Sequence, residues 1–217
     1  QLEHSTSMQP ELRALDAYNP RDRLVEWVRG FGVTTLHTGH APGELISGQT
    51  MIVKTAGNTV EAAVMVETAA LAVTLAQSAK KGKGKSPGTR GKMMAMLRGE
   101  FVAAQRYLEK RETADEDKKP DRNLRFEVLG RVLKREIPLL ITAHRAQDIA
   151  SALRLAEEFE FDIILDGAAE SYLLIDEIKA AGVAVIVHPT MTRAFGELEN
   201  LSYETAATLR HAGIPLA

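Results

Sequence analysis

Four of the six histidines stand at or directly after the ends of short apolar runs, where side chains of parallel α/β proteins meet to do chemistry. They are His37, His40, His144 and His188, and Asp166 follows another such run. Zinc binds three or four such ligands and lowers the pKa of a bound water to about 7. The pattern predicts a divalent-metal site in which zinc is the favoured metal and His144 is the leading candidate ligand. Hydrogen bonding of these histidines to loop backbones is the alternative.

Four further polar residues are candidates for substrate binding: Gln49, Lys54, Arg145 and Glu170. Gln49 closes a glycine-containing loop, 39–49, which could present backbone N–H groups to an anion or carbonyl, or simply form a tight turn. Lys54 could be a carbamylated ligand or an anion anchor, or it could extend to water. Arg145 and Glu170 could orient a substrate, or belong to surface ion pairs worth under about 1 kcal/mol.

The elements that would position these residues repeat in the order amphipathic helix, short turn and apolar strand. Predicted strands cover residues 33–37, 137–143, 161–165, 183–187 and 214–217. Predicted helices cover residues 21–29, 121–135, 146–158, 169–180 and 203–211. Continuously apolar strands joined through single helices indicate a buried parallel sheet, because right-handed crossovers cover its faces. The sequence thus predicts an α/β protein in which Gly182 and Gly213 follow helix ends.

The middle of the chain is less regular. Residues 50–55 are typical of a strand, residues 60–75 are rich in alanine and valine without a clear period, and residues 89–111 predict a helix. The stretch ETADEDKKP, at 112–120, predicts a charged and mobile connection. We place it within one domain that covers residues 1–217.

Composition places the chain among ordinary globular proteins and limits the classes of partner that it can be expected to bind. Of its 217 residues, 45% are hydrophobic and 26% are charged, and the formal net charge is −2. This balance argues against nucleic acid as a partner, and no apolar stretch approaches the roughly 18 residues of a membrane span. The sequence has no cysteine, which excludes disulfides and leaves cytoplasm and periplasm equally open. We therefore expect neither nucleic acid nor a membrane as a partner.

Several phrases resemble the amidohydrolase superfamily, and within it the branch related to imidazolonepropionase. They are GVTTLHTGHAPGELISGQTMIVKTAG at 32–57, SPGTRGKMMAMLRGEFVAAQRY at 86–107, IPLLITAHRAQDIASALRLAEEF at 137–159 and AAGVAVIVHPT at 180–190. The resemblance implies a metal-dependent hydrolase of C–N bonds, often those of cyclic amides. It also implies a (β/α) barrel of the TIM type.

Two metal-ligand positions that the resemblance implies are altered in this chain. The phrase similar to Ile-His-Ala-His-Arg-Ala reads ITAHRA, which places Thr142 at the fifth-strand ligand. The phrase similar to Leu-Glu-His-Gly-Thr-Glu reads LDGAAE, which places Gly167 at the sixth-strand ligand. Glycine has no ligating side chain, and a threonine hydroxyl is a poor zinc ligand. His144 or Asp166 could substitute, although strand alternation turns Asp166 away from the face of Gly167.

The first-strand and eighth-strand ligands of the family are expected outside residues 1–217. A complete barrel typically needs about 250 residues, so we expect a barrel that is incomplete at both ends. Further segments, a second copy in a homo-oligomer or a partner chain would complete it. The leading hypothesis, which follows from the resemblance, is a hydrolase that uses metal-activated water to cleave C–N bonds of the cyclic-amide type in a small-molecule substrate. The alternative is a metal-free, catalytically degenerate barrel that binds a small ligand or a partner, and a fragment without independent function is a third possibility.

Overall fold

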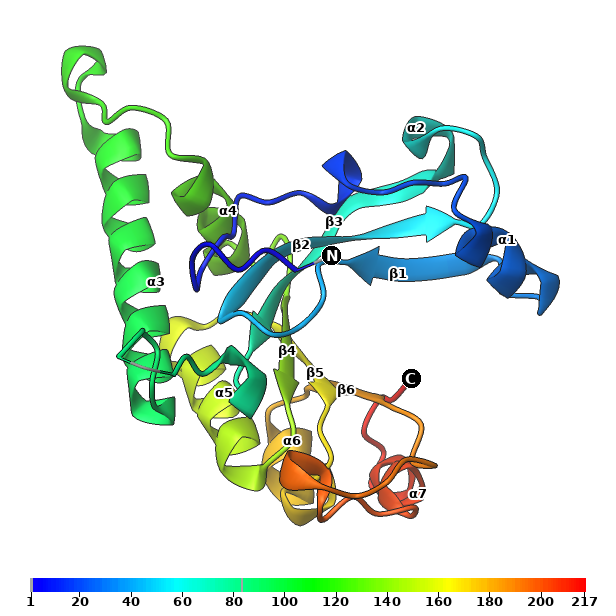
Figure 1. Ribbon diagram of the computed structural model, residues 1–217. Helices are drawn as coiled ribbons and strands as arrows, with labels where there is room; N and C mark the ends of the chain where they lie inside the picture. The colour runs from blue at the N-terminus through cyan, green and yellow to red at the C-terminus, as the bar shows by residue number, and fades with distance from the viewer. Residues whose placement is uncertain (1, 83) are drawn as a thin grey trace.

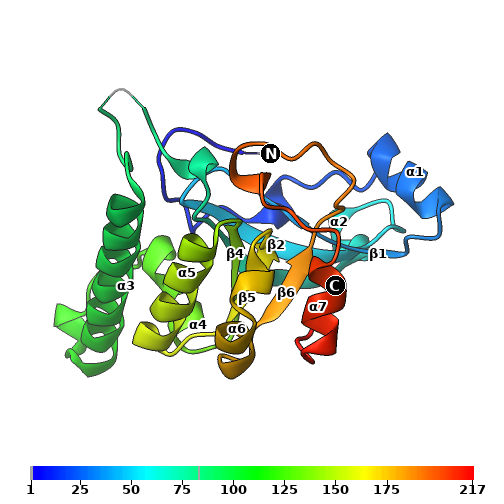
Figure 2. The same ribbon diagram turned by 90° about the horizontal axis from the view of Figure 1, so that it is seen from below.

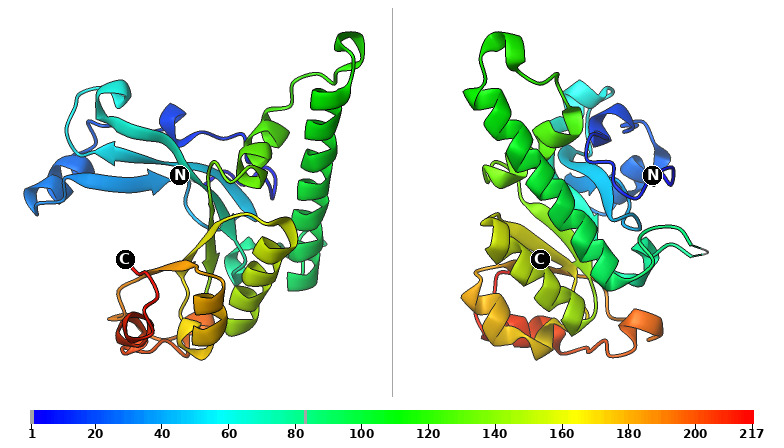
Figure 3. Two further views of the ribbon diagram at one scale, coloured as in Figure 1. Left: turned by 180° about the vertical axis from the view of Figure 1, so that it is seen from behind. Right: turned by 90° about the vertical axis from the view of Figure 1, so that its left-hand side faces the viewer.

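The computed structural model describes residues 2–82 and 84–217, which form a mixed α/β fold around one six-stranded sheet (Figure 1). The strands are β1 Thr35–Gly39, β2 Ile46–Lys54, β3 Val64–Thr74, β4 Leu139–Ala143, β5 Ile163–Gly167 and β6 Ala184–Val187, in that order across the sheet. β1, β2 and β3 are antiparallel neighbours, whereas β3 to β6 run parallel. The sheet curls like part of a barrel (Figure 3).

Helices cover one face of the parallel strands, as Figure 2 shows for α3, α5 and α6, while α1 and α2 accompany the antiparallel strands. The α-helices are α1 Arg23–Gly30, α2 Val60–Ala63, α3 Arg90–Thr113, α4 Leu124–Leu133, α5 Ala146–Phe159, α6 Ile175–Ala180 and α7 Thr205–His211. Short 3-10 helices are η1 Ala14–Asp16, η2 Gln77–Ala79, η3 Glu116–Lys118, η4 Ser171–Leu173 and η5 Gly196–Leu198. None of the described helices is long and apolar enough to cross a lipid bilayer.

Strand alternation separates the hydrophobic core from the concave face of the sheet. Leu139, Ile141 and Ala143 of β4 are fully buried in one cluster with apolar residues of α3 and α5. Because successive side chains of a strand point to opposite faces, Thr142 points to the concave face. Its partner in the parallel register of β5 is Asp166, which therefore lies beside it on the same face.

The parallel half of the sheet confirms the prediction made from sequence. Gly182 and Gly213 have φ values of +66° and +78°, the left-handed conformation expected after a helix. The predicted strand at 214–217 is reduced to a single bridge between Leu216 and Val185. The predicted helix at 169–180 is shorter than expected, because the 3-10 helix η4 precedes α6. The predicted connection at 112–120 contains the end of α3 and η3, and its mobility stays a prediction.

The antiparallel half differs from the prediction. The strand expected at 33–37 is not part of a parallel unit, since β1 pairs antiparallel with β2 at the edge of the sheet. β2 begins at Ile46, so the end of the expected loop at 39–49 is strand. β3 is absent from the prediction. Its first residues are largely exposed and its last ones buried, so neither alternation nor one apolar run marks it.

Candidate functional site

Three polar side chains form a hydrogen-bonded chain at the carboxyl ends of β4, β5 and β6. Thr142 Oγ1 donates to Asp166 Oδ2 at 2.7 Å, and Asp166 Oδ1 lies 2.9 Å from His188 Nε2. Thr142 and Asp166 are only 8% and 9% exposed, whereas His188 is exposed. The carboxylate favours the tautomer of His188 that carries its proton on Nε2, which leaves Nδ1 as a proton acceptor.

The strand register brings these three residues together. Asp166 pairs with Thr142 on one side and with Ile186 of β6 on the other. His188 stands two residues after Ile186 and so continues on the same face of the sheet. The strand β5 ends at Gly167, one residue after Asp166, where Gly167 and Ala168 both have positive φ values, +77° and +36°. This turn leaves the Asp166 carboxylate at the rim of the sheet.

His144, the leading metal-ligand candidate, lies directly after β4 and packs against Gly167. A Cβ placed on Gly167 would lie 2.5 Å from His144 Cε1. His144 Nδ1 is buried and has no hydrogen-bond partner among the described residues. Burial lowers the pKa of His144, and the carboxylates of Glu197 and Asp166 oppose this only in part. The imidazole is therefore neutral at pH 7, and it occupies the space that a side chain at position 167 would need.

Arg145 and Glu170, two substrate-binding candidates, pair with each other at the start of α5. Glu170 is 5% exposed and accepts hydrogen bonds from Ala146 N at 2.7 Å, Arg145 Nη1 at 3.0 Å and Asn200 Nδ2 at 2.8 Å. Burial pushes the pKa of Glu170 upward, but these hydrogen bonds outweigh it and the pKa lies below its usual value. The Glu170 carboxylate caps the N-terminus of α5, because it accepts the Ala146 N–H. The N-cap residue itself, Arg145, has no side-chain capping hydrogen bond.

The other two histidine candidates lie on the antiparallel part of the sheet. His37 stands within β1, where its Nε2 lies 2.7 Å from Thr50 Oγ1. His40 follows β1 and packs against Gly48, and its buried Nε2 has no partner among the described residues. Burial lowers the pKa of both histidines, and for His37 the charge of Asp166 acts in the opposite direction.

The last two substrate-binding candidates also belong to β2 rather than to the parallel strand ends. Lys54 is exposed at the end of β2, and its Nζ donates to Thr35 Oγ1 at 2.9 Å. Gln49 is buried, donates to Pro10 O at 3.1 Å and accepts from Thr68 Oγ1 at 3.0 Å. Because both amide ends of Gln49 are engaged, its side chain acts within the fold, and substrate contact by either residue stays a prediction.

No protein-family model and no curated protein matches the chain. Among solved structures, the fold matches the crystal structure of an amidohydrolase from Thermotoga maritima MSB8, with a TM-score of 0.95 and 30% sequence identity over the whole of this chain. The chain is similar to an amidohydrolase. It spans 58% of the length of that protein's chain. The curled sheet thus matches part of an amidohydrolase barrel, which confirms the expected fold, while the full barrel and the imidazolonepropionase-related branch stay predictions.

The described residues do not form a ligand set for the metal that the sequence resemblance implies. Within residues 2–82 and 84–217, no group of three or more His, Cys, Asp or Glu side chains is placed to hold a metal ion. Asp166 and His188 form a hydrogen bond with each other, His144 packs against Gly167, His37 lies within β1 and His40 directly follows it. A metal site would need ligands beyond those described, so zinc binding stays a prediction.

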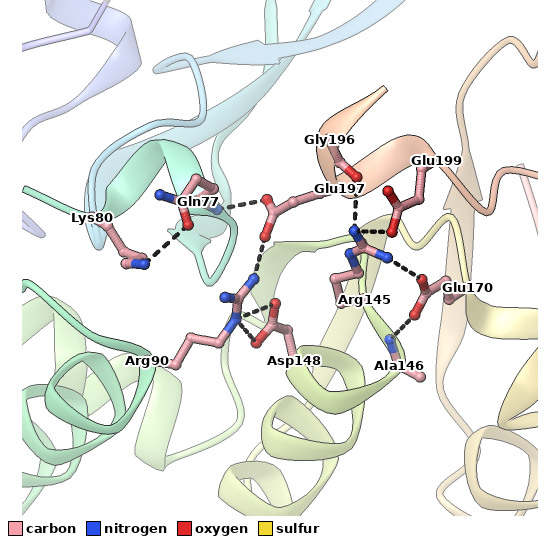
Figure 4. A network of polar contacts seen from close by, with 10 residues as sticks. All are labelled: Gln77, Lys80, Arg90, Arg145, Ala146, Asp148, Glu170, Gly196, Glu197 and Glu199. Atoms are coloured by element: carbon pink, nitrogen blue, oxygen red, sulfur yellow. Dashed lines mark hydrogen bonds and ion pairs between the residues drawn. The ribbon is translucent and has the colours of Figure 1, made fainter. Parts of the chain in front are cut away.

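Arg90 and Glu197 connect separate segments at this edge of the sheet, and neither was singled out from the sequence. Arg90, the first residue of α3, donates from Nε to Asp148 Oδ1 of α5 at 2.7 Å and also binds the Glu197 carboxylate (Figure 4). These partners are separated by 58 and 107 residues in sequence. No helical or strand spacing links residues so far apart, and the sequence carries no local signal for either contact.

We predict that the folded protein loses stability as the pH falls below about 6.5. In the folded state burial lowers the pKa of His37, His40 and His144. Below about pH 6.5 the unfolded chain therefore binds more protons at these sites than the folded chain does, and stability falls with pH. Above that value their contribution is complete.

Urea unfolding between about pH 8 and pH 5 measures this effect. His144→Gln should flatten the fall in the free energy of unfolding, whereas His211→Gln, at the exposed end of α7, should not. Equal slopes for the wild type and His144→Gln would contradict the assignment to His144.

Proposed function

We propose that this protein is an amidohydrolase-type hydrolase that cleaves C–N bonds of small molecules, of the cyclic-amide type. The observation that carries the proposal is the Asp166–His188 pair at the carboxyl ends of parallel strands, in a sheet similar to that of an amidohydrolase. Active sites of TIM-type barrels lie at this end of the strands. Membership of the imidazolonepropionase-related branch belongs to the same proposal, as does completion of the barrel by further segments, a second copy or a partner chain.

In this proposal His188 is the general base. Its Nε2–H donates to Asp166, so Nδ1 accepts a proton from water while the water oxygen bonds to the amide carbonyl carbon. The imidazolium returns that proton to the departing nitrogen as the C–N bond breaks, which leaves a carboxylic acid and an amine. Asp166 stabilises the transient positive charge on the ring, and Thr142 fixes the second oxygen of the carboxylate.

The proposal also includes a divalent metal, with zinc as the first candidate. Some of the ligands of this metal would have to lie beyond the described residues. When bound, such an ion activates water and polarises a carbonyl oxygen. The described residues of this chain do not form its ligand set, so we assign no step to it.

One observation favours a second function, that of a metal-free barrel that binds a small ligand or a partner. The His144 ring fills the space beside Gly167, and the Thr142 hydroxyl donates to Asp166. The two positions where the resemblance implies metal ligands therefore hold packing and hydrogen-bonding groups. A site altered in this way can keep its shape and bind small molecules without hydrolysing them.

Hydrolysis and metal analysis of the natural protein that carries this chain separate the two functions. We expect ring opening in members of a panel of cyclic amides, which gives one product with a free carboxylate and a free amine, and we expect Asp166→Asn to abolish most of it. Mass-spectrometric metal analysis of the wild type and His144→Ala then shows whether metal is present and whether His144 holds it. A folded wild type that binds panel compounds but hydrolyses none of them would reject the hydrolase and leave the binding barrel.

A further inference from the structure

Residues 189–200, within the connection between β6 and α7, run past the carboxyl ends of the strands (Figure 2). Residues 195–200 line a cavity together with His144. Most residues of the segment 189–200 are exposed, with Met191 at 91% and Phe195 at 69%. It forms one wall of a cavity of about 1200 Å³ that His144, Arg90 and Glu170 also line. The segment therefore lies over the part of the sheet edge that carries His144, Arg145 and Glu170.

Glu197 is the main point at which this segment is attached. Its Oε2 accepts a hydrogen bond from Gln77 N at 2.6 Å, and its Oε1 binds Arg90 Nη2 (Figure 4). The Glu197 side chain is only 16% exposed, so the carboxylate is largely withdrawn from water. Arg90 is held in place from its other side by the buried carboxylate of Asp148.

A second group of polar contacts holds the same segment to the start of α5. Arg145 Nη2 donates to Gly196 O at 2.8 Å and to Glu199 Oε1 at 2.7 Å, and Asn200 donates to Glu170. These contacts are hydrogen bonds and ion pairs rather than buried apolar packing. Segments attached in this way open locally at a small fraction of the free energy of global unfolding.

Opening would leave a receptor for an anion. With Glu197 withdrawn, Arg90 would keep one carboxylate partner, Asp148, while the Gln77 N–H would lose the acceptor that it has in the closed state. An N–H group beside a fixed guanidinium is a strong hydrogen-bonding site for an oxyanion, because charge-assisted hydrogen bonds exceed neutral ones in strength. Arg145 lines the same cavity, where its guanidinium is paired with the carboxylates of Glu170 and Glu199.

We propose that residues 189–200 form a lid and that Glu197 is an internal anion in a binding site made by Arg90 and the Gln77 N–H. A small anionic ligand competes with Glu197 for this site, and its binding goes with an open lid. The proposal concerns only the binding of an anion, so it does not depend on whether the protein hydrolyses amides.

Acetate is the probe for the vacated site, because it replaces the carboxylate that Glu197→Ala removes. In the isotope-labelled natural protein we expect the Gln77 amide signal of Glu197→Ala to shift with acetate, with a Kd on the order of 1 to 10 mM, at constant ionic strength. The wild type and Glu199→Ala, which keep Glu197, should show binding at least about tenfold weaker. A Gln77 signal that acetate moves equally in all three proteins, or does not move in folded Glu197→Ala, would refute the site.

Backbone hydrogen exchange of residues 190–200 tests the lid with a variant of unchanged shape. Glu197→Gln keeps the side-chain volume and removes the charge, and we expect exchange across the segment to accelerate about tenfold or more. Glu199→Gln, which lies on the same segment and contacts Arg145 near the surface, should have a smaller effect. Unchanged exchange in Glu197→Gln would show that this carboxylate does not hold the segment closed.

Discussion

Asp166→Asn is expected to lower kcat/KM for amide hydrolysis by about 10²- to 10⁴-fold while the protein stays folded. The substitution keeps an acceptor for Thr142 Oγ1, so the buried side chain retains a hydrogen bond. It removes the negative charge that stabilises the His188 imidazolium, and its amide group can present N–H to the ring in place of an acceptor. Initial rates on a cyclic amide that the wild type hydrolyses provide the measurement.

Two further readouts make this expectation specific to the Asp166–His188 pair. Asp162 directly precedes β5, at the opposite end of the strand from Asp166, and its exposed carboxylate pairs with Arg135. Asp162→Asn should leave kcat/KM within about twofold of the wild type. The fall should appear in kcat rather than in KM, because the pair acts on the reacting water and not in substrate binding. Full activity of a folded Asp166→Asn would exclude the pair from catalysis.

The parallel half of the fold could be predicted because its signals are local. The runs at β4, β5 and β6 are apolar on both faces and are joined by single amphipathic helices, which indicates a covered parallel sheet. The antiparallel half could not be predicted in the same way. β1 has the composition of a strand, but no residue pattern within 33–37 indicates that the neighbouring strand, β2, runs antiparallel to it.

The candidate site shows the same limit. Strand ends could be located from the sequence, and His144, Asp166 and His188 do lie at one edge of the sheet. Their mutual geometry depends on register and on the turn at Gly167, which no spacing reveals. The sequence places His37 and His40 at a parallel strand end only if β1 is a parallel strand, whereas β1 runs antiparallel to β2, with His37 within it and His40 directly after it.

Gly167→Ala is expected to destabilise the protein by about 2 to 4 kcal/mol. The left-handed conformation, with φ of +77°, costs an L side chain about 1 to 2 kcal/mol. The new methyl group would also lie 2.5 Å from His144 Cε1, which forces the ring out of its packed position. Chemical denaturation monitored by circular dichroism gives the change in the free energy of unfolding.

A matched glycine and a double mutant separate these two costs. Gly182 has φ of +66° and open space where its Cβ would stand, so Gly182→Ala should carry the backbone cost alone, about 1 to 2 kcal/mol. In the His144→Ala background Gly167→Ala should fall to the same value, because the clash is gone and only the backbone strain remains. Equal effects of Gly167→Ala with and without His144 would mean that the ring does not fill the space at position 167. The altered ligand position would then be an open space beside β5, and the case for a degenerate metal site would weaken accordingly.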